Sequence, residues 1–290
     1  MLILGVSFAL LIGVSLGLLG GGGSIMTVPI LLYVFNLPAR QAIATSLLVV
    51  GTTSAAALIP HARAGRVQWR TGAIFGATSM VGAYLAGRVA SHIPAAALIL
   101  AFGVMMVITA IAMMRGRKSN GDSEVSHEPR HLPIGKIIAE GLVVGAVTGL
   151  VGAGGGFLVV PALVLLGGLP MGVAVGTSLL VIAMKSFAGF AGYLSSVSIP
   201  WSIAGMVVAA AMVGSVIGAR LVKVIPPEGL RKGFAWFVVV MAVFILGQEV
   251  PKLFGVNVTV ATHWPWLLAA MSVPPALGAL LSLRRAPAHA

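Results

Sequence analysis

The chain contains no cysteine, and only six of its 290 residues are acidic. Without cysteine, disulfide bonds and thiol chemistry are excluded. Six acids leave no carboxylate pair for catalysis, so an intramembrane enzyme is disfavoured. No glycine run is followed by Lys-Ser or Lys-Thr, which excludes a phosphate-binding loop and leaves no cofactor implied.

Charge is also scarce, at 8% of the residues against about 25% in a soluble protein. The remaining sequence, 59% of it hydrophobic, forms repeated apolar runs, several of them near the length that spans a bilayer. We therefore predict an all-α polytopic membrane protein surrounded by lipid. The apolar segments fall near residues 2–19, 25–36, 41–60, 71–90, 94–114, 134–152, 157–168, 173–195, 201–222, 229–248 and 264–283.

The net charge of +12 would suggest nucleic acid in a soluble domain. In this chain most of the basic residues cluster in the connections between apolar runs, as the positive-inside rule expects, and we predict no nucleic-acid partner. The first run has no basic residue before it and no small-residue cleavage site, so it is expected to be a retained span.

Two glycine-rich stretches, Gly17–Pro29 and Gly149–Pro161, interrupt this apolar sequence. Each glycine in a helix costs roughly 1 kcal/mol relative to alanine, so clustered glycines favour a break. At membrane depth such a break is tolerated only where the freed backbone is buried in protein or lines a cavity. Each break precedes a segment too short to span the bilayer, 25–36 or 157–168, as a half-helix would be.

The sequence repeats itself at an offset of 132 residues (149 − 17). Without a gap, this offset pairs Thr45-Ser46-Leu47-Leu48 with Thr177-Ser178-Leu179-Leu180, and Ile93-Pro94 with Ile225-Pro226. We predict two tandem membrane repeats, each opening with a glycine-broken helix hairpin, followed by a C-terminal span. The expected divisions are a first repeat at 1–115, a cytoplasmic linker at 116–133, a second repeat at 134–250, and a C-terminal span and tail at 251–290.

Loop charge indicates how the repeats are oriented. The connection at 61–70 carries three arginines, whereas its counterpart at 193–202 carries no charge, and the next pair of connections reverses this pattern. Equivalent loops on opposite faces are typical of an inverted repeat, with the central linker and the C-terminus in the cytoplasm. A parallel duplication with four spans in each half remains open.

Free backbone N–H groups at the start of a half-helix form an anion site without a basic side chain. In an inverted repeat the two breaks are expected to approach each other near the membrane midplane. The predicted site residues at the breaks are Gly20, Gly21, Gly22, Gly23, Ser24, Gly152, Gly154, Gly155 and Gly156. The alternative is close helix packing, to which we assign the pairs Gly13/Gly17, Gly72/Gly76 and Gly214/Gly218.

Two further elements of the predicted site are hydroxyls and a lysine. Thr45, Ser46, Thr177 and Ser178 follow Leu-Pro turns; they either donate to an oxyanion or bond to their own helices. Lys185 lies in the middle of an apolar segment, where a lysine costs about 2.5–3.5 kcal/mol. Its side chain either contacts an anion, reaches the membrane surface, or pairs with Glu140 on another span. His61, beside three arginines, is interpreted as a solvated loop residue.

The duplicated glycine-rich opening, the Leu-Pro turn and the repeated Thr-Ser-Leu-Leu resemble the sulfite exporter TauE/SafE family of membrane permeases, from about Gly13 to Gln248. The resemblance implies a prokaryotic cell-membrane protein that moves sulfite, a sulfonate or a related organosulfur anion. We therefore expect a secondary transporter of a small anionic solute; an anion channel and a membrane scaffold without transport are the alternatives. Assembly as a homo-oligomer is left open.

Overall fold

The protein is described by a computed structural model at residues 2–19, 24–115, 134–151, 156–165, 169–221, 238–240 and 242–250. Every regular element in these ranges is helical, which confirms the predicted all-helical class. The central linker 116–133 and the predicted span 264–283 lie outside them. The elements are α1 (Leu2–Leu19), α2 (Ser24–Pro29), η1 (Ile30–Val34), α3 (Ala39–Arg63), α4 (Trp69–Val89), η2 (Ala90–His92), α5 (Ala95–Arg115), α6 (Ile134–Val151), α7 (Gly156–Leu165), α8 (Met171–Leu194) and α9 (Trp201–Leu221), followed by helical residues at 238–240 and 242–250.

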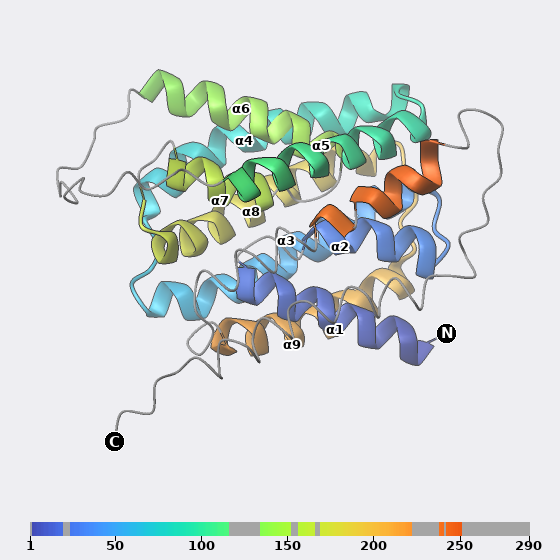
Figure 1. The fold of residues 1–290 in the computed structure, drawn as a ribbon, viewed down its shortest axis with the longest axis horizontal. Coiled ribbons are helices and arrows are strands. Elements are labelled where there is room, and N and C mark those ends of the chain that lie inside the picture. Colours follow the sequence, from blue (N-terminus) through green and yellow to red (C-terminus); the bar gives the residue numbers. More distant parts are fainter. Residues whose placement is uncertain are drawn as a thin grey trace.

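Four helices in the described ranges are long and apolar enough to cross a membrane. They are Ala39–Arg63, Trp69–His92, Gly172–Tyr193 and Trp201–Arg220. Shorter apolar helices accompany them, among them parts of α1, α5 and α6. Figure 1 shows α4 beside α6 along one edge of the bundle and α1 beside α9 along the other, with α3 and α8 between them.

The two short apolar segments are short helices, as the sequence predicts. In the first, α2 continues into the π-helical turn η1, and the second is α7. An equivalent backbone hydrogen bond occurs after each of them: Leu37 N–H donates to the Leu31 carbonyl at 3.0 Å, and Leu169 N–H donates to the Leu163 carbonyl at 3.1 Å. The following prolines, Pro38 and Pro170, are extended, and α3 and α8 start immediately after them.

The helices begin at a constant spacing. The starts of α6, α7, α8 and α9 lie 132 residues after those of α1, α2, α3 and α4 (134 − 2, 156 − 24, 171 − 39 and 201 − 69). The packing follows the same spacing: α1 packs on α9 as α6 packs on α4, and α3 packs on its own counterpart α8.

Glycines allow the two outer helix pairs to touch backbone to backbone. A side-chain carbon at Gly13 or Gly17 would meet the α9 backbone at Ala211 or Ser215. At the equivalent positions, Gly145 lies against Ser79 and Gly149 against Ala83 of α4. The contacts advance in the same direction on both partners, so each pair runs parallel. The predicted packing role of Gly13/Gly17 is confirmed. Gly214 and Gly218 of α9 lie against the backbone of α1 in the same helix–helix contact.

The central pair, α3 and α8, is antiparallel. Gln41 near the start of α3 donates to Ser198, beyond the end of α8, at 3.3 Å. Beyond the other end of α3, the Gln68 N–H donates to Thr177, near the start of α8, at 2.9 Å. Gly51 packs against Phe187 between these two contacts.

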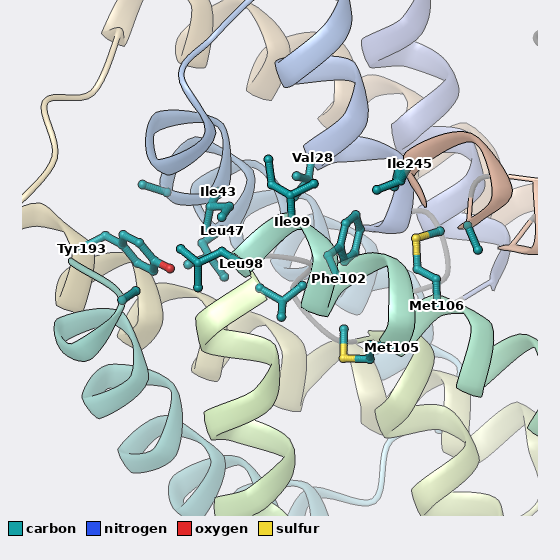
Figure 2. Close-up of a cluster of buried hydrophobic side chains, with 14 of the residues drawn as sticks. Val28, Ile43, Leu47, Leu98, Ile99, Phe102, Met105, Met106, Tyr193 and Ile245 are labelled. Carbon is teal, nitrogen blue, oxygen red and sulfur yellow. The ribbon is translucent and has the colours of Figure 1, made fainter. Parts of the chain in front are cut away.

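Two apolar clusters occupy opposite ends of the central pair. The first, part of which is drawn in Figure 2, gathers Val28, Ile43, Leu47, Val151 and Tyr193 among others, around the start of α3 and the end of α8. Phe102, Met105 and Met106 of α5 and Ile245 complete its other side. The second cluster gathers Leu16, Ala57, Val159, Leu163 and Leu179 among others, around the end of α3 and the start of α8.

Candidate functional site

The glycine breaks separate the described helices where the sequence predicts. Helix α1 ends at Leu19 and α2 begins at Ser24, while α6 ends at Val151 and α7 begins at Gly156. Ser24 is fully buried and is the first residue of α2, one position inside the expected cap. The predicted site residues Gly20, Gly21, Gly22, Gly23, Gly152, Gly154 and Gly155 lie outside the described residues.

The helices that lead into the two breaks belong to different apolar clusters. Leu16, four residues before Gly20, is in the second cluster, whereas Val151, immediately before Gly152, is in the first. The half-helices α2 and α7 do contact each other. The break residues themselves lie outside the described ranges, so the expected meeting of both breaks near the midplane stays a prediction.

Lys185 lies beside the second break. Its side chain is 1% exposed, and its ammonium donates to Thr148 Oγ1 of α6 at 3.1 Å. The Thr148 hydroxyl itself donates to the Val144 carbonyl at 2.6 Å, so its hydrogen is already used. Thr148 is three residues before the end of α6, which places the ammonium within roughly 5 Å of that end along the helix axis.

This position bears on two of the three alternatives for Lys185. The ammonium is buried inside the bundle, which excludes an extended side chain that reaches the membrane surface. Its hydrogen-bond partner in the described part of the chain is Thr148, and it forms no ion pair there with Glu140. Glu140 lies eight residues before Thr148, roughly 12 Å away along α6. Because an ammonium carries three donors, Lys185 retains hydrogen-bonding capacity for a further ligand.

The two halves differ at this position. Thr53 is the counterpart of Lys185 at the offset of 132, and its hydroxyl donates to the Val49 carbonyl of its own helix at 2.7 Å. The next residues, Ser54 and Ser186, are both fully buried, and their hydroxyls have no hydrogen-bond partner among the described residues. At this position the first half thus has a hydroxyl and the second half an ammonium.

The four predicted Thr and Ser residues do not gather at one point. Ser46 donates to the Ile43 carbonyl and Ser178 to the Val175 carbonyl, both at 2.7 Å. These are hydrogen bonds to their own helices, which was one of the two alternatives for these hydroxyls. Thr177 accepts a hydrogen bond from the Gln68 N–H, beyond the end of α3. Ser46 is 17 residues before the end of α3, so roughly 25 Å of helix separates it from Thr177.

Thr45 is different, because it is fully buried and its hydroxyl has no partner among the described residues. Thr27 of α2 shares both properties. Buried polar groups in proteins are nearly always hydrogen-bonded, so such hydroxyls are candidates for contact with a ligand or water. Thr27 was not predicted from the sequence, although a hydroxyl inside a half-helix could have indicated it.

Tyr193 and His61 occupy equivalent positions, again 132 residues apart. The Tyr193 hydroxyl donates to the Leu150 carbonyl at 2.8 Å, which satisfies one of the last carbonyls of α6 before the break. His61 is 3% exposed, so the interpretation of a solvated loop residue is wrong. The charged neighbours in the sequence concealed that His61 is still within α3, on its buried face.

A buried acid was also missed. Glu249 is 7% exposed and accepts a hydrogen bond from the Tyr33 hydroxyl of η1 at 3.3 Å. The Tyr33 ring contacts Phe244 edge-on, with ring centroids 5.2 Å apart. Glu249 directly follows the apolar segment 229–248, and this position could have indicated a buried acid. In the described residues no three His, Cys, Asp or Glu side chains gather as they would around a metal ion.

Known proteins of similar sequence are named probable membrane transporter proteins. A probable membrane transporter protein of Xylella fastidiosa is 33% identical over 242 residues, which cover 82% of this chain and 92% of the relative. A probable membrane transporter protein of Methanocaldococcus jannaschii is 29% identical over 255 residues (81% and 92%), and YdhB of Bacillus subtilis is 26% identical over 237 residues (80% and 94%). No solved structure matches the chain.

The profile of the family described as sulfite exporter TauE/SafE matches residues 5–245, which include both glycine-rich openings and Lys185. Together with the transporter relatives, this match makes the chain a multi-pass membrane protein of a transporter family rather than of an enzyme family. The chain belongs to the sulfite exporter TauE/SafE family.

Proposed function

We propose that the protein is a secondary transporter that moves a small sulfur-containing oxyanion, such as sulfite or a sulfonate, across the cell membrane. The observation that carries this proposal is the buried ammonium of Lys185, which has a hydroxyl partner and no acidic partner among the described residues. A buried charge without a counter-charge is costly, so the site is suited to a ligand that brings a negative charge. The sulfur-containing class is taken from the family.

The second glycine break would supply the other half of the site. Helix α7 starts at Gly156, and the first N–H groups of a helix are free to bind an anion with the help of the helix dipole. Lys185 Nζ is near the preceding end of α6. In this proposal Gly152, Gly154, Gly155 and Gly156 allow the oxyanion to approach the backbone, while Lys185 binds it from α8. The hydroxyls of Ser54 and Ser186 are available at the same depth of the bundle.

We infer further that residues 1–115 and 134–250 are inverted repeats. The constant spacing of the helix starts supports a duplication. The antiparallel contact of α3 with its counterpart α8 supports the inversion, because equivalent helices would then cross the membrane in opposite directions. A parallel duplication would make these two helices run the same way.

This arrangement supports a topology with the central linker in the cytoplasm. The end of α3 carries Arg63 and lies beside the start of α8, at the face with the arginine-rich connection 61–70. The uncharged connection 193–202 then faces outward, with Ser198 beside Gln41. Positive-inside reasoning places the arginine-rich face, the linker 116–133 and the C-terminal tail in the cytoplasm.

Transport of radiolabelled sulfite into proteoliposomes tests the proposed function, with a sulfonate and sulfate as competitors. We expect saturable uptake that the sulfonate reduces, and faster uptake when the vesicles contain unlabelled sulfite, because a carrier exchanges its ligand. Uptake that neither saturates nor responds to internal sulfite would instead indicate an anion channel. Uptake equal to that of protein-free vesicles would leave the membrane scaffold as the better explanation.

A further inference from the structure

His61 is a buried histidine whose ring has no hydrogen-bond partner. Its side chain is 3% exposed, and neither Nδ1 nor Nε2 has a partner among the described residues. Nine-tenths or more of buried polar groups in proteins are paired, and an unpaired one destabilises the fold. A histidine held in this way is available for a proton or a ligand, because imidazole is the side chain whose unperturbed charge change falls between pH 5 and 8.

The position of His61 relates it to the first glycine break. Its counterpart Tyr193 contacts the Leu150 carbonyl, two residues before the second break. At the offset of 132, the sequence positions equivalent to Tyr193 and Leu150 are His61 and Leu18. Leu18 lies two residues before the first break. The packing agrees, because Ala57, one turn before His61 on the same face of α3, is in the second apolar cluster with Leu16 of α1. That cluster also contains Val159 and Leu163 of the half-helix α7.

His61 and Lys185 lie at different depths of the α3–α8 pair. In the antiparallel α3–α8 pair, Gly51 is level with Phe187, so His61 is level with residue 177 or nearby. Lys185 is eight residues further along α8, which is roughly 12 Å. The lysine and the histidine are thus two basic groups at successive depths of the same helix pair, one toward each glycine break.

The charges around His61 would link the proton to the anion. The backbone N–H of Arg66 donates to the backbone carbonyl of His61 at 3.0 Å, so Arg66 is close in the chain fold to His61. Arg63 and Arg70 belong to the same connection. Neither α1 nor α7, which contribute to the second apolar cluster together with Ala57, carries a charged residue, and Glu140 is near the corresponding end of α6. A second positive charge on His61 is disfavoured beside these arginines unless an anion is present. By reciprocity, a proton on His61 then favours the anion.

We propose that His61 is the proton-carrying residue of the transporter, so that an oxyanion crosses together with a proton bound to the imidazole. This inference rests on the proposed anion transport and adds its coupling ion. Lys185 is the basic group next to the second break, and His61 supplies a positive charge that is gained and lost in each cycle. Net movement of the anion then follows the pH gradient, whereas exchange of one anion for another does not require proton release.

The test uses proteoliposomes and radiolabelled sulfite, with protein-free vesicles to measure passive entry of its protonated forms. Two measurements are made on each protein: accumulation driven by an inward proton gradient, and exchange against internal sulfite at equal pH. The variants are His61→Tyr, which places there the residue found at position 193, and His61→Gln. His92→Gln removes an exposed histidine and is the matched control.

We expect both His61 variants to retain exchange but to lose the accumulation caused by the pH gradient, while His92→Gln behaves like the wild type. Accumulation equal to the wild type in either His61 variant would overturn the proposal. Loss of exchange as well, in correctly folded His61→Tyr protein, would make His61 an anion-binding or structural residue and would also overturn it. Absence of exchange in the wild type would instead refute the proposed transport itself.

Discussion

Adding one methyl group at Gly149 tests how closely α6 must pack on α4. A side-chain carbon there would lie 2.7 Å from both Cα and the carbonyl oxygen of Ala83, and these are backbone atoms that cannot rotate away. The helices would have to separate by several tenths of an ångström or more, and such overpacking typically costs about 1–3 kcal/mol. Alanine also raises helix propensity by about 1 kcal/mol, which partly offsets the loss.

Gly205→Ala is the matched control, because this exposed α9 glycine has no atom within 4 Å of the added carbon. It receives the propensity gain alone, so the two variants should differ by about 1–3 kcal/mol. In a chain of this size each kcal/mol shifts the melting temperature by about 2–4 °C. Thermal unfolding in detergent should therefore place Gly149→Ala roughly 2–12 °C below Gly205→Ala. Equal melting temperatures would refute the close backbone contact of α4 and α6.

Two other predictions follow from the proposed arrangement. Single cysteines at Arg66 and Ser198 of this cysteine-free chain should react with an impermeant reagent from opposite sides of the membrane, and labelling from the same side would contradict the inverted repeat. Gly155→Leu should abolish sulfite transport in a correctly inserted protein, because a side chain would fill the space that the anion approaches. Normal uptake by this variant would assign the glycines of the second break to packing.

Much of the fold could be predicted because glycine and apolar spacing are visible in a single sequence. The clusters before Ser24 and Gly156 indicated where the short helices α2 and α7 begin. The offset of 132 predicted equivalent helices, and the structure has the same spacing between their starts. The direction in which α3 meets α8 is a property of tertiary packing, for which loop charge was only indirect evidence.

The site was less accessible to sequence reasoning. Lys185 was evident because a charge in an apolar span is rare, but its partner was not, because Thr148 is an ordinary residue of a membrane helix. His61 was misassigned because the neighbouring charges suggested a loop. Its alignment with Tyr193, which lies in an apolar segment, could have indicated that His61 is part of a helix. Glu249 and Tyr33 meet across 216 residues, and no local pattern predicts such a contact.

Binding of sulfite to the purified protein tests the central claim, that an oxyanion binds at Lys185, most directly. Lys185→Met removes the charge at similar length, and a hydrogen bond to a charged group is worth roughly 1.5–3 kcal/mol, or about 10- to 150-fold in affinity. We expect the half-saturating sulfite concentration to rise by that factor without loss of protein yield. Thr53→Val, at the equivalent position of the other repeat, should leave the affinity nearly unchanged. Wild-type affinity in Lys185→Met would contradict the claim. So would recovery of yield and transport in Lys185→Met/Glu140→Gln after each single change had reduced them.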